Sequence, residues 1–271
     1  MNQALNHYAL FGNPVGHSLS PLMHNAAFGA LGVRALYRAQ CVENLEFSVR
    51  LIREMPLAGV SVTLPVKGAI MAFLDEVDED ARAIGAVNTI KNEGGILRGS
   101  NTDWIGLIAA MREQFSLEGK KIAVLGAGGA ARAAVYGILR EGGIPIVINR
   151  SRDRGESLAR WFQCDAMPLT KLGMVEAEVI INTTPVGMSP LINETPVDQR
   201  YLPRFRWVVD TIYNPLETRL LREAKAAGCG VVTGLSMFVR QGAEQIRIWT
   251  GLEPPVELMT RVVETALAAR Q

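Results

Sequence analysis

A glycine-rich turn stands near the middle of the chain, between an apolar segment and an alanine-rich segment. The apolar segment is 121–125, and the turn at 126–131 reads GAGGAA. In this G-x-G-x-x-A pattern the first glycine permits a tight turn, the second lets the backbone approach a pyrophosphate, and the last small residue permits close packing of helix on strand. The start of the next helix then faces the phosphates. The pattern predicts a dinucleotide site that includes Gly126, Ala127, Gly128, Gly129 and Ala130.

The end of the next expected strand indicates which dinucleotide binds. Sites that prefer NAD place Asp or Glu about 20 residues further on, where the carboxylate bonds the ribose 2′-hydroxyl. This chain instead has an amide, a hydroxyl and arginines there: Asn149, Arg150, Ser151, Arg152 and Arg154. Guanidinium groups suit a 2′-phosphate, so we expect NADP rather than NAD. A solvated basic loop is the alternative, which Asp153 and Glu156 support in part.

A lysine and an aspartate are candidates for proton chemistry. In the segment 61–67 (SVTLPVK), Pro65 suits the start of a helix, which would place Lys67 in the first turn. A cation there opposes the helix dipole, and such a local conflict indicates a functional site, although a surface lysine is the alternative. Asp103 is expected at the start of a later helix. One of the two would handle a proton during alcohol oxidation, while the other orients it and balances its charge.

Hydroxyl side chains stand before an expected helix near the N-terminus. Pro21 suits the first helical position and Ser20 the N-cap, while capping does not require Ser18. A helix start with hydroxyls on it suits a carboxylate or a phosphate. Further polar clusters follow expected strands at 182–185, 210–215 and 234–237, the ends at which parallel sheets bind ligands. Each cluster alone is also typical of an ordinary turn.

Short apolar runs alternate with helical patterns along the chain, which predicts an α/β fold with mainly parallel sheets. We expect strands at 8–12, 35–40, 59–62, 121–125, 145–149, 179–182, 208–212 and 230–233, and helices at 22–31, 130–139 and 256–267. Residues 88–97 read as two short strands joined by a turn. A complete βαβ series begins near residue 119, so a domain boundary is expected near residue 102.

The composition excludes several classes of protein. The 271 residues allow one or two domains. Lys and Arg number 28 against 27 Asp and Glu, which argues against nucleic-acid binding and against a polybasic membrane-surface protein. Three cysteines are too few and too scattered for a disulfide framework or a CxxC metal site. The three histidines all lie within the first 24 residues, which argues against a metal site built jointly from His and Cys. Without an apolar run of membrane-spanning length or a secretory signal, we expect a cytoplasmic protein.

Several motifs follow one another in a fixed order over nearly the whole chain. They are 12–14 (GNP), 18–21 (SLSP), 62–67 (VTLPVK), 85–89 (GAVNT), 101–103 (NTD), 126–130 (GAGGA), 149–151 (NRS), 182–188 (NTTPVGM), 213–215 (YNP), 234–237 (GLSM) and 241–243 (QGA). In this order the set resembles the shikimate/quinate dehydrogenase family. The resemblance implies reversible, NADP-dependent reduction of 3-dehydroshikimate to shikimate in aromatic amino acid biosynthesis.

The resemblance also implies domains and residue roles. Residues 1–102, completed by C-terminal helices within 241–271, would form the substrate domain, and 103–240 a Rossmann domain for NADP. Lys67 would be the acid/base, paired with Asp103. Substrate ligands would be Ser18, Ser20, Thr63, Asn88, Asp103, Tyr213 and Gln241. Cofactor ligands would be Gly126–Ala130, Asn149, Arg150, Ser151 and Arg154, with Thr183, Gly234 and Met237 on the nicotinamide side. The protein would be a monomer or a homodimer.

Two departures from the family pattern bear on the shape of the substrate site. Ser61 stands where the family usually has Asn, and Trp104 where Gly is frequent. A quinate dehydrogenase, or a relative that uses both substrates or NAD, is therefore the enzymatic alternative. A non-catalytic regulator that responds to NADP is the alternative from another class. Such a regulator has no need of Lys67 and Asp103.

Overall fold

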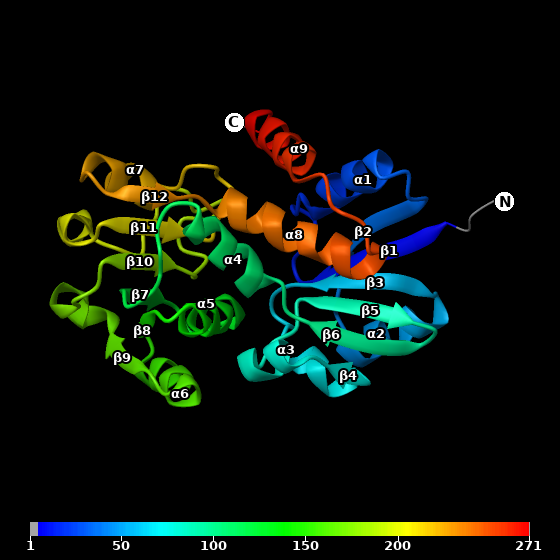
Figure 1. The fold of residues 1–271 in the computed structure, drawn as a ribbon, viewed down its shortest axis with the longest axis horizontal. Helices are drawn as coiled ribbons and strands as arrows, with labels where there is room; N and C mark the ends of the chain where they lie inside the picture. The colour runs from blue at the N-terminus through cyan, green and yellow to red at the C-terminus, as the bar shows by residue number, and fades with distance from the viewer. Residues whose placement is uncertain (1–4, 271) are drawn as a thin grey trace. The chain divides into compact units, whose positions relative to one another are not determined.

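The computed structural model describes residues 5–270, which form alternating strands and helices (Figure 1). Their contacts divide the chain into two compact units, Met1–Thr102 with Gln241–Gln271, and Asp103–Arg240. Helix α8 (Gly234–Thr250) begins in the second unit and ends in the first. Within the range 5–270, no helix is long and apolar enough to cross a membrane.

The first unit is built on a mixed sheet of six strands. Across the sheet they are β2 (Ala35–Cys41), β1 (Asn6–Gly12), β3 (Leu57–Val62), β5 (Thr89–Glu93), β6 (Ile96–Ser100) and β4 (Glu76–Val77). β1 runs parallel to β2 and β3, whereas β5 runs antiparallel to β3 and β6. Thr89, where β5 begins, therefore pairs with Ser61 near the end of β3 and with Ser100 at the end of β6. One edge of the sheet thus collects the segments that follow β1, β3 and β6 and the segment that precedes β5.

Helices cover both faces of this sheet because successive strand residues point to opposite sides. Ala9 and Phe11 belong to the core shared with α2 (Leu45–Glu54), η1 (Ala69–Phe73) and α3 (Glu79–Ile84). Tyr8 instead stacks on Phe28 of α1 (Ser20–Ala30) and contacts Trp249 of α8. Helix α9 (Val256–Ala268) packs on α1.

The second unit has a six-stranded sheet in which every ladder is parallel. Its order is β12 (Gly230–Val232), β11 (Trp207–Asp210), β10 (Val179–Asn182), β7 (Lys121–Leu125), β8 (Ile144–Asn149) and β9 (Asp165–Pro168). From β7 the chain adds strands outward to β9, then returns to place β10 on the other side of β7. This reversal is the switch point at which such sheets bind their ligands.

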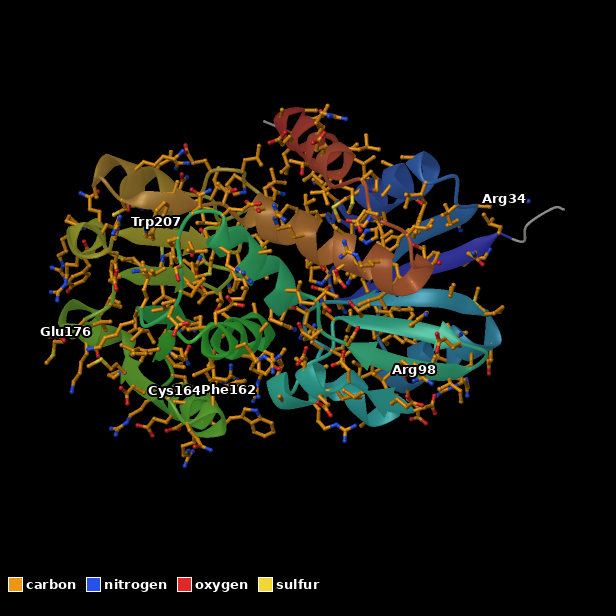
Figure 2. The ribbon with its side chains drawn as sticks, in the orientation of Figure 1. Arg34, Arg98, Phe162, Cys164, Glu176 and Trp207 are labelled. Carbon is orange, nitrogen blue, oxygen red and sulfur yellow. The ribbon has the colours of Figure 1, made fainter. Side chains whose placement is uncertain are left out.

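The two faces of the second sheet have separate cores. Ile122 and Val124 pack with α4 (Asp103–Arg112), α5 (Gly129–Arg140) and α6 (Arg152–Phe162). Ala123 and Leu125, which alternate with them, pack with η2 (Leu169–Met174), η3 (Gln199–Arg204) and α7 (Arg219–Ala226). Three side chains that Figure 2 labels pack against the core formed with α4, α5 and α6: Phe162, Cys164 and Trp207.

The predicted α/β class is confirmed. The eight strands predicted outside residues 88–97 are present with ends shifted by at most two residues, and the two predicted within 88–97 are β5 and β6, of which β6 ends three residues later, at Ser100. The short strands β4 and β9 were not predicted. Two predicted helix starts are wrong. Helix α1 begins at Ser20 itself, with Leu19 at the N-cap, and no helix begins at Pro65.

Candidate active site

Ser18 and Ser20 lie together where the chain enters α1. The Ser18 hydroxyl lies 3.1 Å from the Ser20 hydroxyl and accepts the Ser20 main-chain N–H at 3.2 Å. Ser18 therefore supports the helix start, a task that we assigned to Ser20 alone. Two hydroxyls beside the free N–H groups of a first helical turn form a site suited to a carboxylate.

Lys67 lies in a turn between β3 and η1, before the 3₁₀ helix that begins at Ala69. Its position in the first turn of a helix was predicted wrongly, and no helix dipole opposes its charge there. The Lys67 carbonyl accepts the Val87 N–H at 2.8 Å. Thr63 passes so close to Gly12 that an added Cβ would lie 2.3 Å from Thr63 Cγ2. The Thr63 N–H also donates to the Phe11 carbonyl at 2.8 Å, so main-chain bonds join this loop to the end of β1 and to the segment before β5.

Asn88, which is 2% exposed, has both ends of its amide held by neighbours. Its Oδ1 accepts the Thr102 N–H at 2.7 Å and the Thr89 hydroxyl at 2.8 Å. Its Nδ2 donates to Thr102 Oγ1 at 2.9 Å and lies 3.4 Å from Gln241 Oε1. Because a main-chain N–H only donates, the atom of the Asn88 amide that faces the Thr102 N–H must be the oxygen. Asn88 and Gln241, both predicted substrate ligands, therefore lie side by side.

Asp103 opens α4, as predicted, and is 5% exposed. It directly follows Thr102, the residue that orients Asn88. The next residue, Trp104, presents its ring edge-on to Tyr136 of α5, with ring centroids 5.5 Å apart. The large side chain at 104, a departure from the family pattern, is thus packed within the second unit.

The glycine-rich turn has the shape that a pyrophosphate requires. Gly126 has φ of +118°, and a Cβ there would lie 2.6 Å from the Thr183 hydroxyl oxygen. Gly128 is the N-cap of α5 and offers no side-chain cap, and a Cβ there would meet nothing within 4 Å. Ala131 is fully buried against the sheet. Open backbone thus lies beside unpartnered N–H groups at the helix start, which fits a dinucleotide phosphate.

The strand tip expected to select NADP carries two available guanidinium groups. Arg152 is paired with Glu156 at 2.6 Å. Arg150 and Arg154 are exposed and have no ion-pair partner within the described part of the chain. Asn149 donates through Nδ2 to the Ser151 carbonyl at 2.8 Å, which fixes the turn between β8 and α6. The alternative of a solvated basic loop therefore fits Arg152, which Glu156 neutralises, whereas the charges of Arg150 and Arg154 are available to a phosphate.

A buried aspartate joins the tips of β10 and β11. Asp210 accepts from Asn182 Nδ2 and from the Ile212 N–H, both at 3.1 Å, and from the Thr218 hydroxyl at 2.7 Å. Asn182 Oδ1 in turn accepts from the main chain and the hydroxyl of Thr184. Burial raises the pKa of Asp210 to about 6 in spite of its three donors. This network fixes the two loops that carry Thr183 and Tyr213.

Residues expected on the nicotinamide side differ in accessibility. The Thr183 hydroxyl donates to the Leu125 carbonyl at 2.6 Å, beside the glycine-rich turn. Gly234 passes so close to the loop after β11 that a Cβ would lie 2.2 Å from the Ile212 carbonyl oxygen. Met237 is 8% exposed and belongs to the core between the sheet and α5. Met237 is therefore mainly a packing residue in this structure.

The predicted substrate ligands are divided between the two units. Ser18, Ser20, Thr63, Asn88 and Gln241 belong to the first, together with Lys67. Asp103 and Tyr213 belong to the second, where the Tyr213 ring stacks on Phe238 with centroids 3.9 Å apart. Among the residues that the structure describes, no group of three or more His, Cys, Asp or Glu is arranged to hold a metal.

Two residues that hold Asn88 in place were not predicted from the sequence. They are Thr102 and Gln245. Gln245 is 1% exposed, and its Nε2 donates to the Asn88 carbonyl at 3.2 Å and to Thr89 Oγ1 at 3.0 Å. The available signal was its spacing of four from Gln241, which places both amides on one face of a helix.

The parallel sheet of the second unit, with its glycine-rich turn at the switch point, and the mixed sheet of the first unit, with polar side chains along one edge, define a two-domain α/β dehydrogenase class. Three family models match: the shikimate dehydrogenase substrate binding domain at residues 10–90, shikimate/quinate 5-dehydrogenase at 108–212, and the shikimate 5′-dehydrogenase C-terminal domain at 234–264.

Relatives with known names match over almost their whole length. A shikimate dehydrogenase (NADP(+)) of Pyrococcus abyssi is 43% identical, with 94% of this chain and 96% of the relative covered. That of Geobacillus kaustophilus is 44% identical, with 96% and 98% covered. The crystal structure of shikimate 5-dehydrogenase from Thermus thermophilus, in complex with NADP(H) and shikimate, matches with a TM-score of 0.90 at 40% identity, with 97% and 100% covered. The chain belongs to the shikimate dehydrogenase family, which confirms the resemblance in its ordered motifs.

Proposed function

We propose that this chain catalyses the reversible, NADP-dependent reduction of 3-dehydroshikimate to shikimate, a step of aromatic amino acid biosynthesis. The observation that carries the proposal is the set of side chains along one edge of the first sheet. The segments that carry these hydroxyls, two amides and one amine come after β1 and β3, before β5, and at the first-unit part of α8. These groups match a ring that bears a carboxylate, several hydroxyls and one reactive oxygen.

Each class of side chain has a role in binding the ring. Ser18 and Ser20 hold the carboxylate beside the first turn of α1, with help from Tyr213. The ring hydroxyls are bound by Thr63, Asn88, Asp103 and Gln241. The support for Asn88 is strongest because its amide is held in one orientation before any ligand arrives, so little ordering is required on binding.

The second unit binds NADP, which supplies or accepts the hydride when it is bound. The turn at Gly126–Ala130 and the N–H groups of α5 hold the phosphates. The 2′-phosphate end is bound by Asn149, Arg150, Ser151 and Arg154. Thr183 and Gly234 line the nicotinamide side, with Met237 behind them. The open backbone at Gly128 and the two available guanidinium groups support this assignment.

Lys67 handles the proton of the reaction. In reduction its ammonium group donates a proton to the carbonyl oxygen as the carbon receives hydride, and in oxidation the neutral amine takes the proton back. Asp103 balances the charge of Lys67 and directs it. Support comes from the main chain, because the Lys67 carbonyl bonds the residue before Asn88, and Asp103 directly follows the residue that orients Asn88.

We further propose that the first unit is the substrate domain and that the protein acts on small molecules alone. The balanced charge offers no field for nucleic acid or an anionic membrane. All three cysteines are unpaired, which fits a reducing cytoplasm. The chain acts as a monomer or a homodimer.

The test of the proposed reaction is reduction of the nicotinamide ring, followed by absorbance. Shikimate and quinate are each combined with NADP and NAD. Turnover that is fast only with shikimate and NADP supports the proposal. Comparable turnover with quinate or NAD assigns the chain to the relatives of dual preference. No turnover in any combination, with NADP binding intact, favours the regulator.

A further inference from the structure

A chain of buried hydrogen bonds runs from strand β2 to Asn88. The Tyr37 hydroxyl lies 2.6 Å from Ser61 Oγ, and Ser61 Oγ lies 2.7 Å from Gln245 Oε1. On its other side, Gln245 bonds Thr89 Oγ1, which bonds Asn88 Oδ1. Tyr37 and Ser61 are 1% and 4% exposed, so water does not substitute for these contacts.

The donor and the acceptor of every bond in this hydrogen-bonded series follow from main-chain groups that can only donate or only accept. Thr102 N–H only donates, so Asn88 Oδ1 accepts, and it also takes the Thr89 proton. Gln245 must present Nε2 to the Asn88 carbonyl, because that oxygen only accepts. Its Oε1 then accepts from Ser61. Because the Ser61 proton is used in that bond, Ser61 Oγ accepts the Tyr37 proton, and Tyr37 is the terminal donor on which the order depends.

Tyr37 is held on both sides although β2 is the outermost strand of the sheet. The side-chain amide of Asn25 bonds both the N–H and the carbonyl of Tyr37, at 2.8 and 2.9 Å, and takes the place of a neighbouring strand. The His24 ring stacks on the Tyr37 ring at 4.3 Å and 10°. Burial lowers the pKa of His24 to about 4, so its ring is neutral and Nδ1–H donates to the Ser20 carbonyl at 2.9 Å. Tyr37 thus contacts the helix that carries Ser20 as well as the chain to Asn88.

We infer that Tyr37 and Ser61 are positioning residues for substrate binding, acting on Asn88 through Gln245 and Thr89. The inference rests on the proposed function, in which Asn88 binds a ring hydroxyl. Without the Tyr37 hydroxyl, no donor holds the Ser61 hydroxyl in one orientation, and Gln245 Oε1 loses its fixed donor. Asn88 then samples orientations that do not bind the ring. The effect falls on shikimate and leaves NADP binding unchanged.

Tyr8, which lies outside this series of hydrogen bonds, provides a matched control. Tyr8 pairs directly with Tyr37 on the neighbouring strand β1, and both rings contact Trp249. Tyr8 is likewise 4% exposed. Its hydroxyl, unlike that of Tyr37, makes no hydrogen bond within residues 5–270. Tyr8→Phe therefore removes the same atom from the same aromatic cluster without touching the chain to Asn88.

The kinetic test compares Tyr37→Phe, Ser61→Ala and Tyr8→Phe with the wild type. One buried hydrogen bond corresponds to a rise of about three- to tenfold in the KM for shikimate in Tyr37→Phe and Ser61→Ala. The kcat and the KM for NADP should change by less than about twofold, as expected when binding alone is weakened. The KM for shikimate of the double variant should be no higher than that of the weaker-binding single variant, because both substitutions interrupt the same series of hydrogen bonds. Equal shikimate KM values in Tyr37→Phe, Tyr8→Phe and the wild type would overturn the inference.

A second measurement is independent of the reaction. The side-chain NH₂ signals of Asn88 and Gln245 are followed by NMR in the protein without ligand, assigned with Asn88→Asp and Gln245→Glu. Both signals should shift in Tyr37→Phe and stay in place in Tyr8→Phe. Unmoved signals in Tyr37→Phe contradict the inference even if the enzyme is active. A wild type inactive on shikimate with shifted signals refutes the proposed reaction but not the positioning of Asn88.

Discussion

Arg150→Ala should weaken NADP far more than NAD. Arg150 is exposed at the tip of β8, and no ion pair with another described residue neutralises it. NADP differs from NAD by the 2′-phosphate alone, so a guanidinium that binds this group contributes to one cofactor and not to the other. The difference between the two losses therefore isolates the phosphate contact.

The magnitude follows from the kind of bond and its exposure. A charge-assisted hydrogen bond contributes about 1.5–3 kcal/mol, which is roughly a 10- to 150-fold change in affinity. Because the tip is exposed and Arg154 supplies a second guanidinium, the lower end is expected, about tenfold for NADP. The loss for NAD should stay below about twofold. Raising the salt concentration should shrink the difference, because salt screens exposed charges.

The assay measures KM for NADP and for NAD at saturating shikimate, with Arg152→Ala as the control. Arg152 lies two residues away in the same basic segment but is already paired with Glu156. Its removal should change the preference for NADP by less than about twofold. Equal losses for NADP and NAD in Arg150→Ala, or an equal effect of Arg152→Ala, would refute the assignment of the 2′-phosphate site.

Two further predictions test the second unit. Gly128→Ala should change the free energy of unfolding by less than about 1 kcal/mol, since the new Cβ meets no atom within 4 Å, yet weaken NADP by at least about tenfold in a binding titration; unchanged NADP affinity contradicts the phosphate site. Burial raises the pKa of Asp210 from 3.8 to about 6, so the folded state binds this proton more tightly than the unfolded state, and stability falls as pH rises through about 4 to 6. In urea unfolding, the free energy of unfolding of Asp210→Asn should therefore fall by up to about 3 kcal/mol less than that of the wild type over this pH range. Identical pH profiles for the two proteins would rule out the raised pKa.

Local patterns predicted the parts of the fold that local physics decides. The run at 121–125, with glycines after it and a small buried residue at Ala131, specifies strand, turn and helix without reference to the rest of the chain. Pro65 shows the limit of this reasoning. Proline suits a helix start, yet the chain there must turn back so that the Lys67 carbonyl reaches the Val87 N–H. That requirement comes from the segment before β5, more than twenty residues after Pro65, and leaves no local signal.

The same limit applies to the site. Motifs named Asn88 and Gln241, but not what orients them, because each partner is supplied by tertiary pairing. Ser61 reaches Gln245 across 184 positions of sequence, and Tyr37 reaches Ser61 across 24. Ser18 was assigned to substrate alone, yet its hydroxyl also accepts an N–H at the start of α1. Polar side chains with two tasks cannot be separated by residue type.

The most direct test of the proton chemistry is the turnover of Lys67→Ala with shikimate and NADP, measured beside its NADP affinity. A general acid/base contributes about a hundredfold to ten-thousandfold, so kcat should fall by at least about a hundredfold. The affinity for NADP should change by less than about twofold, because Lys67 belongs to the first unit and the proposed NADP ligands belong to the second. Turnover near that of the wild type, with the variant folded and NADP bound, would contradict the assignment of Lys67 as the group that carries the proton.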